Sequence, residues 1–197
     1  SLCVILIFAG IGYKISSVPF HFWTPDVYEG APVSITAFLS VASKAAGFAL
    51  LIRFISSGFV VFIGEKGFWH LSQVFDWQTF IIIISIATMT LGNLTALWQT
   101  NLKRMLAYSS IAHAGYILLG LSVLSNQGLL AILIYIIVYG LMNVGAFYII
   151  MLIANTSGSE DINDYSGLGL INPFLAFSLS VFLVSLTGLP PTAGFIG

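Results

Sequence analysis

An uncharged stretch of 55 residues constrains this chain more than any other feature of its sequence. Met105 to Ser159 contains no Asp, Glu, Lys or Arg, and a second uncharged stretch covers Trp77 to Leu102. In the whole chain 58% of residues are hydrophobic and 7% are charged. In soluble globular domains about a quarter of the residues are charged. Since each crossing of a bilayer needs about 20 apolar residues, the chain is expected to be an integral membrane protein with several spans.

Apolar segments separated by short polar loops predict an all-α, polytopic fold with about six transmembrane helices. A β-barrel does not fit, because barrel strands alternate apolar and polar residues and the run 80–84, Phe-Ile-Ile-Ile-Ile, does not. Both ends of the sequence lie inside apolar runs, so we expect residues 1–197 to be a single membrane domain and a fragment of a longer protein. The expected helices cover residues 2–17, 33–56, 77–99, 102–123, 127–153 and 173–190.

The connecting loops are expected at residues 20–32, 57–76, 99–101, 125–127 and 155–172. Lys103 and Arg104 flank the third of these loops. Positive charge is enriched on the cytoplasmic side of membrane proteins, which places this loop in the cytoplasm. By alternation the first and fifth loops are expected on the same side.

Lys44 is the strongest candidate for a functional residue. It is the twelfth residue of the 24-residue segment Val33 to Ser56, so its ammonium is expected near the membrane midplane. Insertion scales put a lysine at a helix centre at about +2.5 to +3.5 kcal/mol. Intramembrane lysines therefore face a wet or partnered interior, and Lys44 is expected to belong to a functional site.

A second lysine, Lys14, follows the glycine-containing run 9–13 and lies five residues before Pro19. Glycine and proline on either side of a charge indicate a discontinuous helix near residues 10–19, with a hydrated cavity beside Lys14. The alternative is that Lys14 extends to the membrane interface. Segment 187–194, Thr-Gly-Leu-Pro-Pro-Thr-Ala-Gly, predicts a second discontinuous helix. Two such helices in one membrane domain are typical of an inverted-repeat transporter.

Polar residues within the predicted spans recur at spacings of three and four, so each helix presents them on one face. Such faces either pack against other helices or hold water, and helix packing is the favoured interpretation for the Ser, Thr and Gly positions. His113 lies on one of these faces as a possible proton-path residue. The four sets are Thr36, Ser40, Ser43, Lys44 and Gly47; Ser85, Thr88, Gly92, Thr95 and Gln99; Ser109, Ser110 and His113; and Tyr135, Tyr139 and Asn143.

The remaining polar residues indicate less. His21, His70 and His113 lack the spacing of metal ligands, so no metal site is expected. Asp26 and Glu29 could pair with a lysine or cap a helix, and capping is the favoured interpretation. No phosphate loop, dinucleotide motif or basic cluster is present in the sequence, so we expect no cofactor in this chain and no nucleic-acid partner.

Four segments resemble the N-type (chain 2) family of antiporter-like subunits of the proton-pumping NADH:quinone oxidoreductase, complex I. They are Pro19 to Pro32, Phe38 to Lys44, Gln99 to His113 and Ser185 to Gly197. The related L and M subunits and the Mrp-type cation/proton antiporters share the lysines and the Lys-Arg-x-Leu-Ala-Tyr-Ser stretch. They usually show Trp-Leu-Pro followed by Ala-His where this chain has Trp-Thr-Pro-Asp-Val-Tyr at 23–28. This difference favours the N type.

The resemblance implies that Lys14 is the lysine of a discontinuous seventh helix and Lys44 the connecting lysine of the eighth. The six spans would then be helices seven to twelve of fourteen. It also implies a glutamate upstream that pairs with the first lysine, and a third lysine directly after Gly197.

The function implied by the resemblance is proton translocation along buried lysines and water, coupled to remote electron transfer. Desolvation disfavours an ammonium and a nearby carboxylate favours it, so movement of a carboxylate could make Lys14 release a proton to Lys44. The implied partners are other membrane subunits of the complex, lipid, protons and, through the complex, quinone, in a bacterial plasma membrane or an equivalent membrane. A stand-alone Mrp-type antiporter and a purely structural subunit remain as alternatives.

Overall fold

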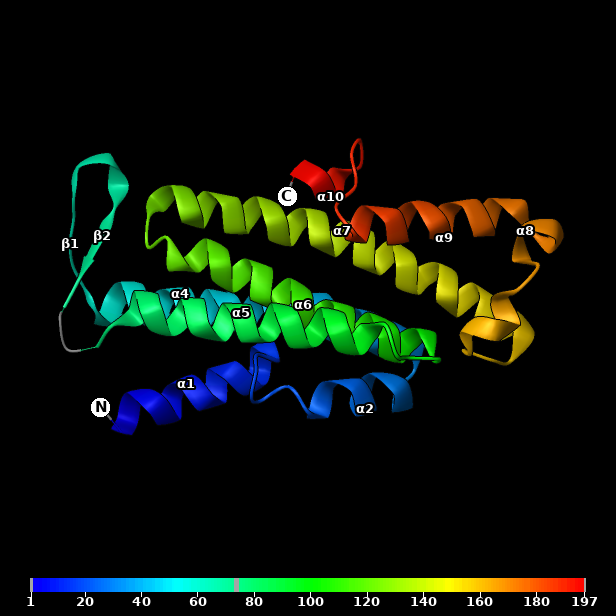
Figure 1. Cartoon of the computed structure of the whole chain (residues 1–197), viewed down its shortest axis with the longest axis horizontal. Coiled ribbons are helices and arrows are strands. Elements are labelled where there is room, and N and C mark those ends of the chain that lie inside the picture. The colour runs from blue at the N-terminus through cyan, green and yellow to red at the C-terminus, as the bar shows by residue number, and fades with distance from the viewer. Residues whose placement is uncertain (1, 73–74, 197) are drawn as a thin grey trace.

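The computed structural model describes residues 2–72 and 75–196, which form a bundle of long helices with a small hairpin at one end (Figure 1). All six helices predicted from the sequence are present, with ends shifted by a few residues. The helices are α1 (Leu2–Ile15), α2 (Trp23–Gly30), α3 (Val33–Phe38), α4 (Lys44–Gly58), α5 (Trp77–Ala96), α6 (Leu102–Ser122), α7 (Asn126–Ser157), α8 (Leu168–Ile171), α9 (Pro173–Leu186) and α10 (Ala193–Ile196). The strands are β1 (Val60–Ile63) and β2 (Trp69–Leu71), and short 3-10 turns cover Glu65–Gly67 and Ile162–Tyr165.

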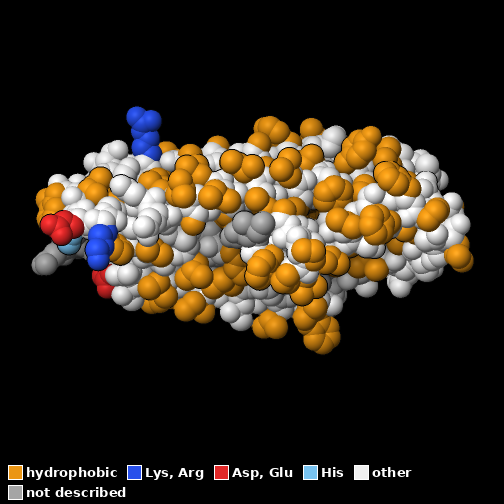
Figure 2. Space-filling view, turned by 90° about the horizontal axis from the view of Figure 1, so that it is seen from above, with side chains coloured by type: hydrophobic (Ala, Val, Ile, Leu, Met, Phe, Trp, Pro, Cys, Tyr) orange, Lys and Arg blue, Asp and Glu red, His pale blue; other side chains and the backbone are white. Residues whose placement is uncertain are grey.

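Four helices in the described residues are long and apolar enough to cross a membrane. They are Val33–Gly58, Trp77–Ala96, Leu102–Ser122 and Asn126–Thr156. Two shorter apolar helices, Cys3–Ile15 and Pro173–Leu186, occupy the first and last of the six expected positions. Figure 2 shows a face that is mostly hydrophobic along its length, with the charged side chains in view gathered at the hairpin end.

The first span is discontinuous, as the sequence predicts, but its second half is helical. α1 ends at Ile15, Ser16 has a positive φ of 61°, and the chain turns before α2 begins at Trp23. Residues 20–32, expected as a loop, therefore contain a helix. Figure 1 shows α1 and α2 nearly end to end along one side of the bundle. The break is satisfied within the protein, because the N–H of Val18 donates to Oγ1 of Thr88 on α5 at 3.1 Å.

The second span contains a π turn over Leu39–Ser43, directly before Lys44. It divides the predicted helix into α3 and α4, although the chain stays helical throughout. A π turn holds one more residue than an α turn, and such turns are frequent at functional sites. The turn therefore determines the direction in which the Lys44 side chain projects from the helix.

The segment 57–76, expected as a loop, contains an antiparallel β-hairpin between Val60 and Leu71. β-branched and aromatic residues dominate the run Val60–Ile63, and Gly67 has the positive φ that suits a turn. The hairpin is held at the end of the bundle, because the N–H of Trp69 donates to the carbonyl of Leu124 at 2.7 Å and its indole to Asn126 at 2.9 Å.

The opposite end of the bundle gathers the α2–α3, α5–α6 and α7–α8 connections. The N–H of Leu102 donates to the carbonyl of Glu160 at 2.9 Å, and that of Ile162 to the carbonyl of Thr100 at 2.8 Å. The first, third and fifth loops thus lie together, as alternation of the spans predicts.

The last span is broken as expected. α9 ends at Leu186, Gly188 has a φ of 75°, and α10 begins at Ala193. Gly194 lies directly against the carbonyl of Ser185, and its N–H donates to the Ser185 hydroxyl at 3.2 Å. Any side chain at Gly194 would clash with this carbonyl, so the glycine allows the chain to fold back onto the end of α9.

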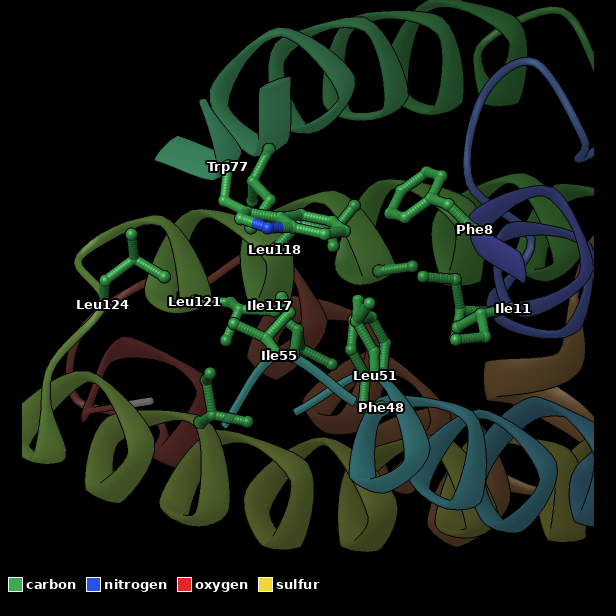
Figure 3. Close-up of a cluster of buried hydrophobic side chains, with 14 of the residues drawn as sticks. Phe8, Ile11, Phe48, Leu51, Ile55, Trp77, Ile117, Leu118, Leu121 and Leu124 are labelled. Carbon is green, nitrogen blue, oxygen red and sulfur yellow. The ribbon is translucent and has the colours of Figure 1, made fainter. Parts of the chain in front are cut away.

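Two apolar clusters form the interior. The first lies towards the hairpin and joins α1, α4, α5 and α6; Figure 3 shows Phe8, Phe48, Trp77 and Leu118 converging within it. The second joins α2, α6, α7 and α9 and includes Tyr28, Leu106 and Phe147. Polar side chains described below lie between the two clusters.

Candidate proton-relay site

Lys44 is buried, with 4% of its surface exposed, and it is held by α6. Its Nζ donates to the backbone carbonyl of Ser110 at 2.6 Å and to the Ser110 hydroxyl at 2.8 Å. The hydroxyl in turn donates to the carbonyl of Ala107 at 2.7 Å. Two of the three ammonium donors are thereby satisfied, and the expectation of a partnered interior is met.

Ser110 lies at the boundary between the two apolar clusters. On α6, Ala107 belongs to one cluster and Ala114 to the other. On α4, Phe48 follows Lys44 by one turn and belongs to the cluster near the hairpin. The ammonium is therefore positioned in a thin polar layer across the middle of the bundle, where low dielectric strengthens each hydrogen bond.

α7 extends this polar layer with a tyrosine and an asparagine. Asn143 Nδ2 donates to the Ser40 hydroxyl at 2.6 Å and to the Tyr139 hydroxyl at 3.1 Å. The Tyr139 hydroxyl donates to the Ser40 carbonyl at 3.3 Å. Because Ser40 lies in the π turn, this network fixes the helix one turn before Lys44.

His113 is buried one turn after Ser110 on α6. Its Nδ1 lies 2.6 Å from the Tyr135 hydroxyl, and its ring lies 4.8 Å from the ring of Tyr139. His113 also lines a cavity of about 550 Å³. The other lining residues include Asn93, Tyr116, Ser185, Thr187, Gly188 and Gly194, so the cavity connects His113 to the broken C-terminal span.

Lys14 is exposed on the described part of the chain, so these residues do not enclose it in the expected cavity. Its position relative to Lys44 is nevertheless defined. A Cβ built on Gly47 would lie 3.4 Å from Cγ of Lys14 and 2.6 Å from the Ile15 side chain. Gly47 thus lets the end of α1 pack one turn beyond Lys44 on α4.

Most of the predicted polar faces are buried and hydrogen-bonded across helices. The Ser85 hydroxyl donates to the carbonyl of Gly115 at 2.7 Å, joining α5 to α6. Thr36 donates to the carbonyl of Tyr28 at 3.1 Å, joining α3 to α2. These contacts hold neighbouring helices together, which is the packing role favoured for the Ser and Thr positions from the sequence.

The cap interpretation of the two acids in α2 is wrong. Arg104 Nη1 lies 2.8 Å from Asp26 Oδ1 and 2.7 Å from Glu29 Oε2. Lys103 is buried rather than simply flanking a loop, and it forms an ion pair with Glu160 at 2.8 Å. The scarcity of charge is the signal that could have indicated the Lys103–Glu160 pair, since a buried charge requires a partner of opposite sign.

Comparisons with known proteins agree with this architecture. The family described as "NADH:quinone oxidoreductase/Mrp antiporter, TM" matches residues 1–197. NADH-quinone oxidoreductase subunit N 2 of Chloroherpeton thalassium is 58% identical over 193 residues, 98% of this chain and 37% of that protein. NADH-quinone oxidoreductase subunit N of Chlorobium chlorochromatii is 55% identical over 193 residues, with the same two coverages. The chain thus spans well under half the length of these relatives.

Solved structures share the fold. A chain of respiratory complex I from Thermus thermophilus has a TM-score of 0.76 and 34% identity, over 98% of this chain and 40% of that one. A chain of the Mrp complex from Dietzia sp. DQ12-45-1b has a TM-score of 0.85 and 25% identity, over 99% of this chain and 34% of that one. This protein is therefore an integral, multi-pass membrane protein, and it belongs to the NADH:quinone oxidoreductase/Mrp antiporter family, within its subunit N group.

Proposed function

We propose that this chain is the proton-translocating part of a membrane subunit of NADH:quinone oxidoreductase, in an energy-transducing membrane. Protons pass along buried side chains and water, and the free energy comes from electron transfer in other subunits that hold the redox cofactors. The subunit works beside other membrane subunits, and quinone acts through the complex. The observation that carries this proposal is the buried Lys44 ammonium between two apolar clusters, held by Ser110 and followed by His113.

In this proposal Lys44 receives a proton from the Lys14 side and passes it towards His113. Ser110 stabilises the protonated amine with two oxygen acceptors. His113, with Tyr135 on Nδ1, leads into the cavity beside the broken C-terminal span. Moving one charge against 100 mV costs about 2.3 kcal/mol, and electron transfer in the other subunits supplies this free energy.

The test is Lys44→Ala in the assembled complex, reconstituted in vesicles with NADH and quinone. We expect assembly close to wild type and a large loss of proton pumping together with coupled quinone reduction. Pumping at the wild-type rate in an assembled Lys44→Ala complex would contradict the relay role and favour a purely structural subunit. Turnover that depends on sodium would favour the Mrp-type alternative.

A further inference from the structure

The π turn over Leu39–Ser43 separates the carbonyl of Ser40 from its usual helical partner. In an α-helix this carbonyl would accept a hydrogen bond from the N–H of Lys44, four residues later. Here the N–H of Lys44 donates to the carbonyl of Val41. Buried backbone carbonyls are almost always hydrogen-bonded, so the Ser40 carbonyl requires a donor other than Lys44.

Hydroxyl groups supply hydrogen bonds to two carbonyls at the turn. The Tyr139 hydroxyl of α7 donates to the Ser40 carbonyl at 3.3 Å. The Ser40 hydroxyl donates to the carbonyl of Ala37, at the end of α3, at 2.8 Å. The first bond comes from another helix, so the geometry of the turn depends on α7 as well as on its own residues.

The amide of Asn143 directs both of these hydroxyl groups. Its Nδ2 donates to the Ser40 hydroxyl at 2.6 Å and to the Tyr139 hydroxyl at 3.1 Å. An amide nitrogen carries two protons, and a hydroxyl group carries one. Each hydroxyl therefore accepts from the amide and gives its single proton to a backbone carbonyl. Loss of the amide would remove the contact that orients both hydroxyl groups.

The surroundings of Asn143 indicate that its amide has this specific role. The side chain is 1% exposed, and Ala146 and Phe147, one turn further along α7, belong to an apolar cluster. An amide in apolar surroundings is costly unless it is hydrogen-bonded, and a leucine would fill similar space without that cost. Close packing alone is already provided by Gly140, whose Cβ would lie 3.2 Å from the Val41 side chain.

We propose that Asn143 is a positioning residue for Lys44. Its amide orients the hydroxyl groups that stabilise the π turn, and the π turn directs the Lys44 ammonium to the carbonyl and hydroxyl of Ser110. Asn143 itself takes up no proton and acts only through Ser40 and Tyr139. This inference rests on the relay role proposed for Lys44.

The first test compares Asn143→Leu with Asn155→Leu in the full reconstituted complex. Asn155 is exposed near the end of the same helix and is the matched control for loss of an amide. We expect Asn143→Leu to assemble and to pump protons about tenfold more slowly, which corresponds to about 1.4 kcal/mol, the order of one or two buried hydrogen bonds. Asn155→Leu should pump at the wild-type rate. Wild-type pumping by Asn143→Leu would overturn the proposal.

A double-mutant cycle distinguishes positioning from a general loss of packing. Asn143→Leu should lower pumping much less in a Ser110→Ala background than in the wild type, because the contact that it positions is already weakened. Equal factors in the two backgrounds would show that Asn143 acts independently of the Lys44–Ser110 contact, and would overturn the proposal.

A structure of the Asn143→Leu complex tests the same inference without any measurement of pumping. It should show Leu39–Ser43 as a regular α-helix, with Lys44 beyond hydrogen-bonding distance of the Ser110 hydroxyl. An unchanged π turn and an unchanged contact would overturn the positioning role.

Tyr139→Phe decides the matter if the Asn143→Leu complex does not assemble. This variant keeps the ring and removes only the donor to the Ser40 carbonyl. Pumping should fall severalfold, whereas Tyr148→Phe, at a tyrosine that is 57% exposed on α7, should pump as wild type. Wild-type pumping by Tyr139→Phe would overturn the proposal.

Lys44→Ala separates this inference from the function on which it rests. If Lys44→Ala stops pumping while Asn143→Leu pumps at the wild-type rate, the positioning role is wrong and the relay stands. If both variants pump normally, both proposals are wrong.

Discussion

Lys44 and Ser110 are joined at two points, because the ammonium donates at 2.6 Å to the serine carbonyl and at 2.8 Å to its hydroxyl. The carbonyl acceptor belongs to the backbone of α6 and survives any substitution of the serine. The hydroxyl acceptor does not. The two contributions to the binding of this ammonium can therefore be separated by mutation.

Ser110→Ala should leave assembly intact and lower proton pumping about tenfold. A hydrogen bond to a charged group contributes about 1.5–3 kcal/mol, and 1.4 kcal/mol corresponds to a factor of ten. Pumping in vesicles, measured against the amount of assembled complex, checks the prediction. Ser122→Ala is the control, since the Ser122 hydroxyl donates to Leu119 at the far end of α6. Equal pumping by the two variants would show that the backbone carbonyl alone is sufficient.

Tyr135→Phe should lower pumping without loss of assembly. The substitution removes the partner that lies 2.6 Å from His113 Nδ1 and leaves the imidazole free to turn within its cavity. The hydrogen bond at one ring nitrogen of a histidine determines which nitrogen carries the proton, so a relay through His113 depends on this contact. Pumping and quinone reduction should fall together and respond differently from wild type to pH. An unchanged pH profile would argue against a role for His113.

Gly92→Ala should destabilise the protein by about 1–3 kcal/mol, the usual cost of overpacking. A Cβ at Gly92 would lie 2.6 Å from the backbone nitrogen of Ala112, where α5 packs against α6. Backbone atoms cannot move aside as a flexible side chain can. Gly10→Ala is the control, because its Cβ would meet no atom within 4 Å. Thermal unfolding of the purified complex should show a lower midpoint for the first variant only.

Labelling should place the two ends of the bundle on opposite sides of the membrane. In a Cys3→Ser background, Thr100→Cys should react with a membrane-impermeant thiol reagent from the cytoplasmic side, because Lys103 and Arg104 lie beside it. Lys66→Cys on the exposed hairpin turn should react only from the other side. Reversed labelling of both would invert the orientation of every span.

The helices could be predicted because their signal is local. Twenty apolar residues in sequence can satisfy their backbone in a membrane only as a helix, whatever surrounds them. The break near Gly188 could also be predicted, since two prolines follow within three residues. The polar faces followed from the helical period, but the contact of Lys44 with Ser110 did not, because the period does not say which face meets which.

Other features depend on partners distant in sequence and were missed for that reason. The sequence 23–30 reads as a polar loop, but it is a helix that buries Thr24, Pro25 and Tyr28. Asp26 and Glu29 on the same helix pair with Arg104 of α6. Tyr28 carries no sequence signal, since a tyrosine in a polar segment looks like a surface residue. The hairpin had a signal in its β-branched run, but that run has only four residues and lies within the segment 57–76, which was expected to be a loop.

The π turn at Leu39–Ser43 gives the Lys44 helix a property that a regular helix lacks. Successive residues of an α-helix are rotated by about 100°, and a π turn inserts one extra residue. The surplus residue therefore shifts every side chain that follows it by about that angle around the axis. Lys44 is the first residue after the turn, and in this register its ammonium reaches both Ser110 acceptors. The register of the helix, and not only the length of the lysine side chain, brings the charge to α6.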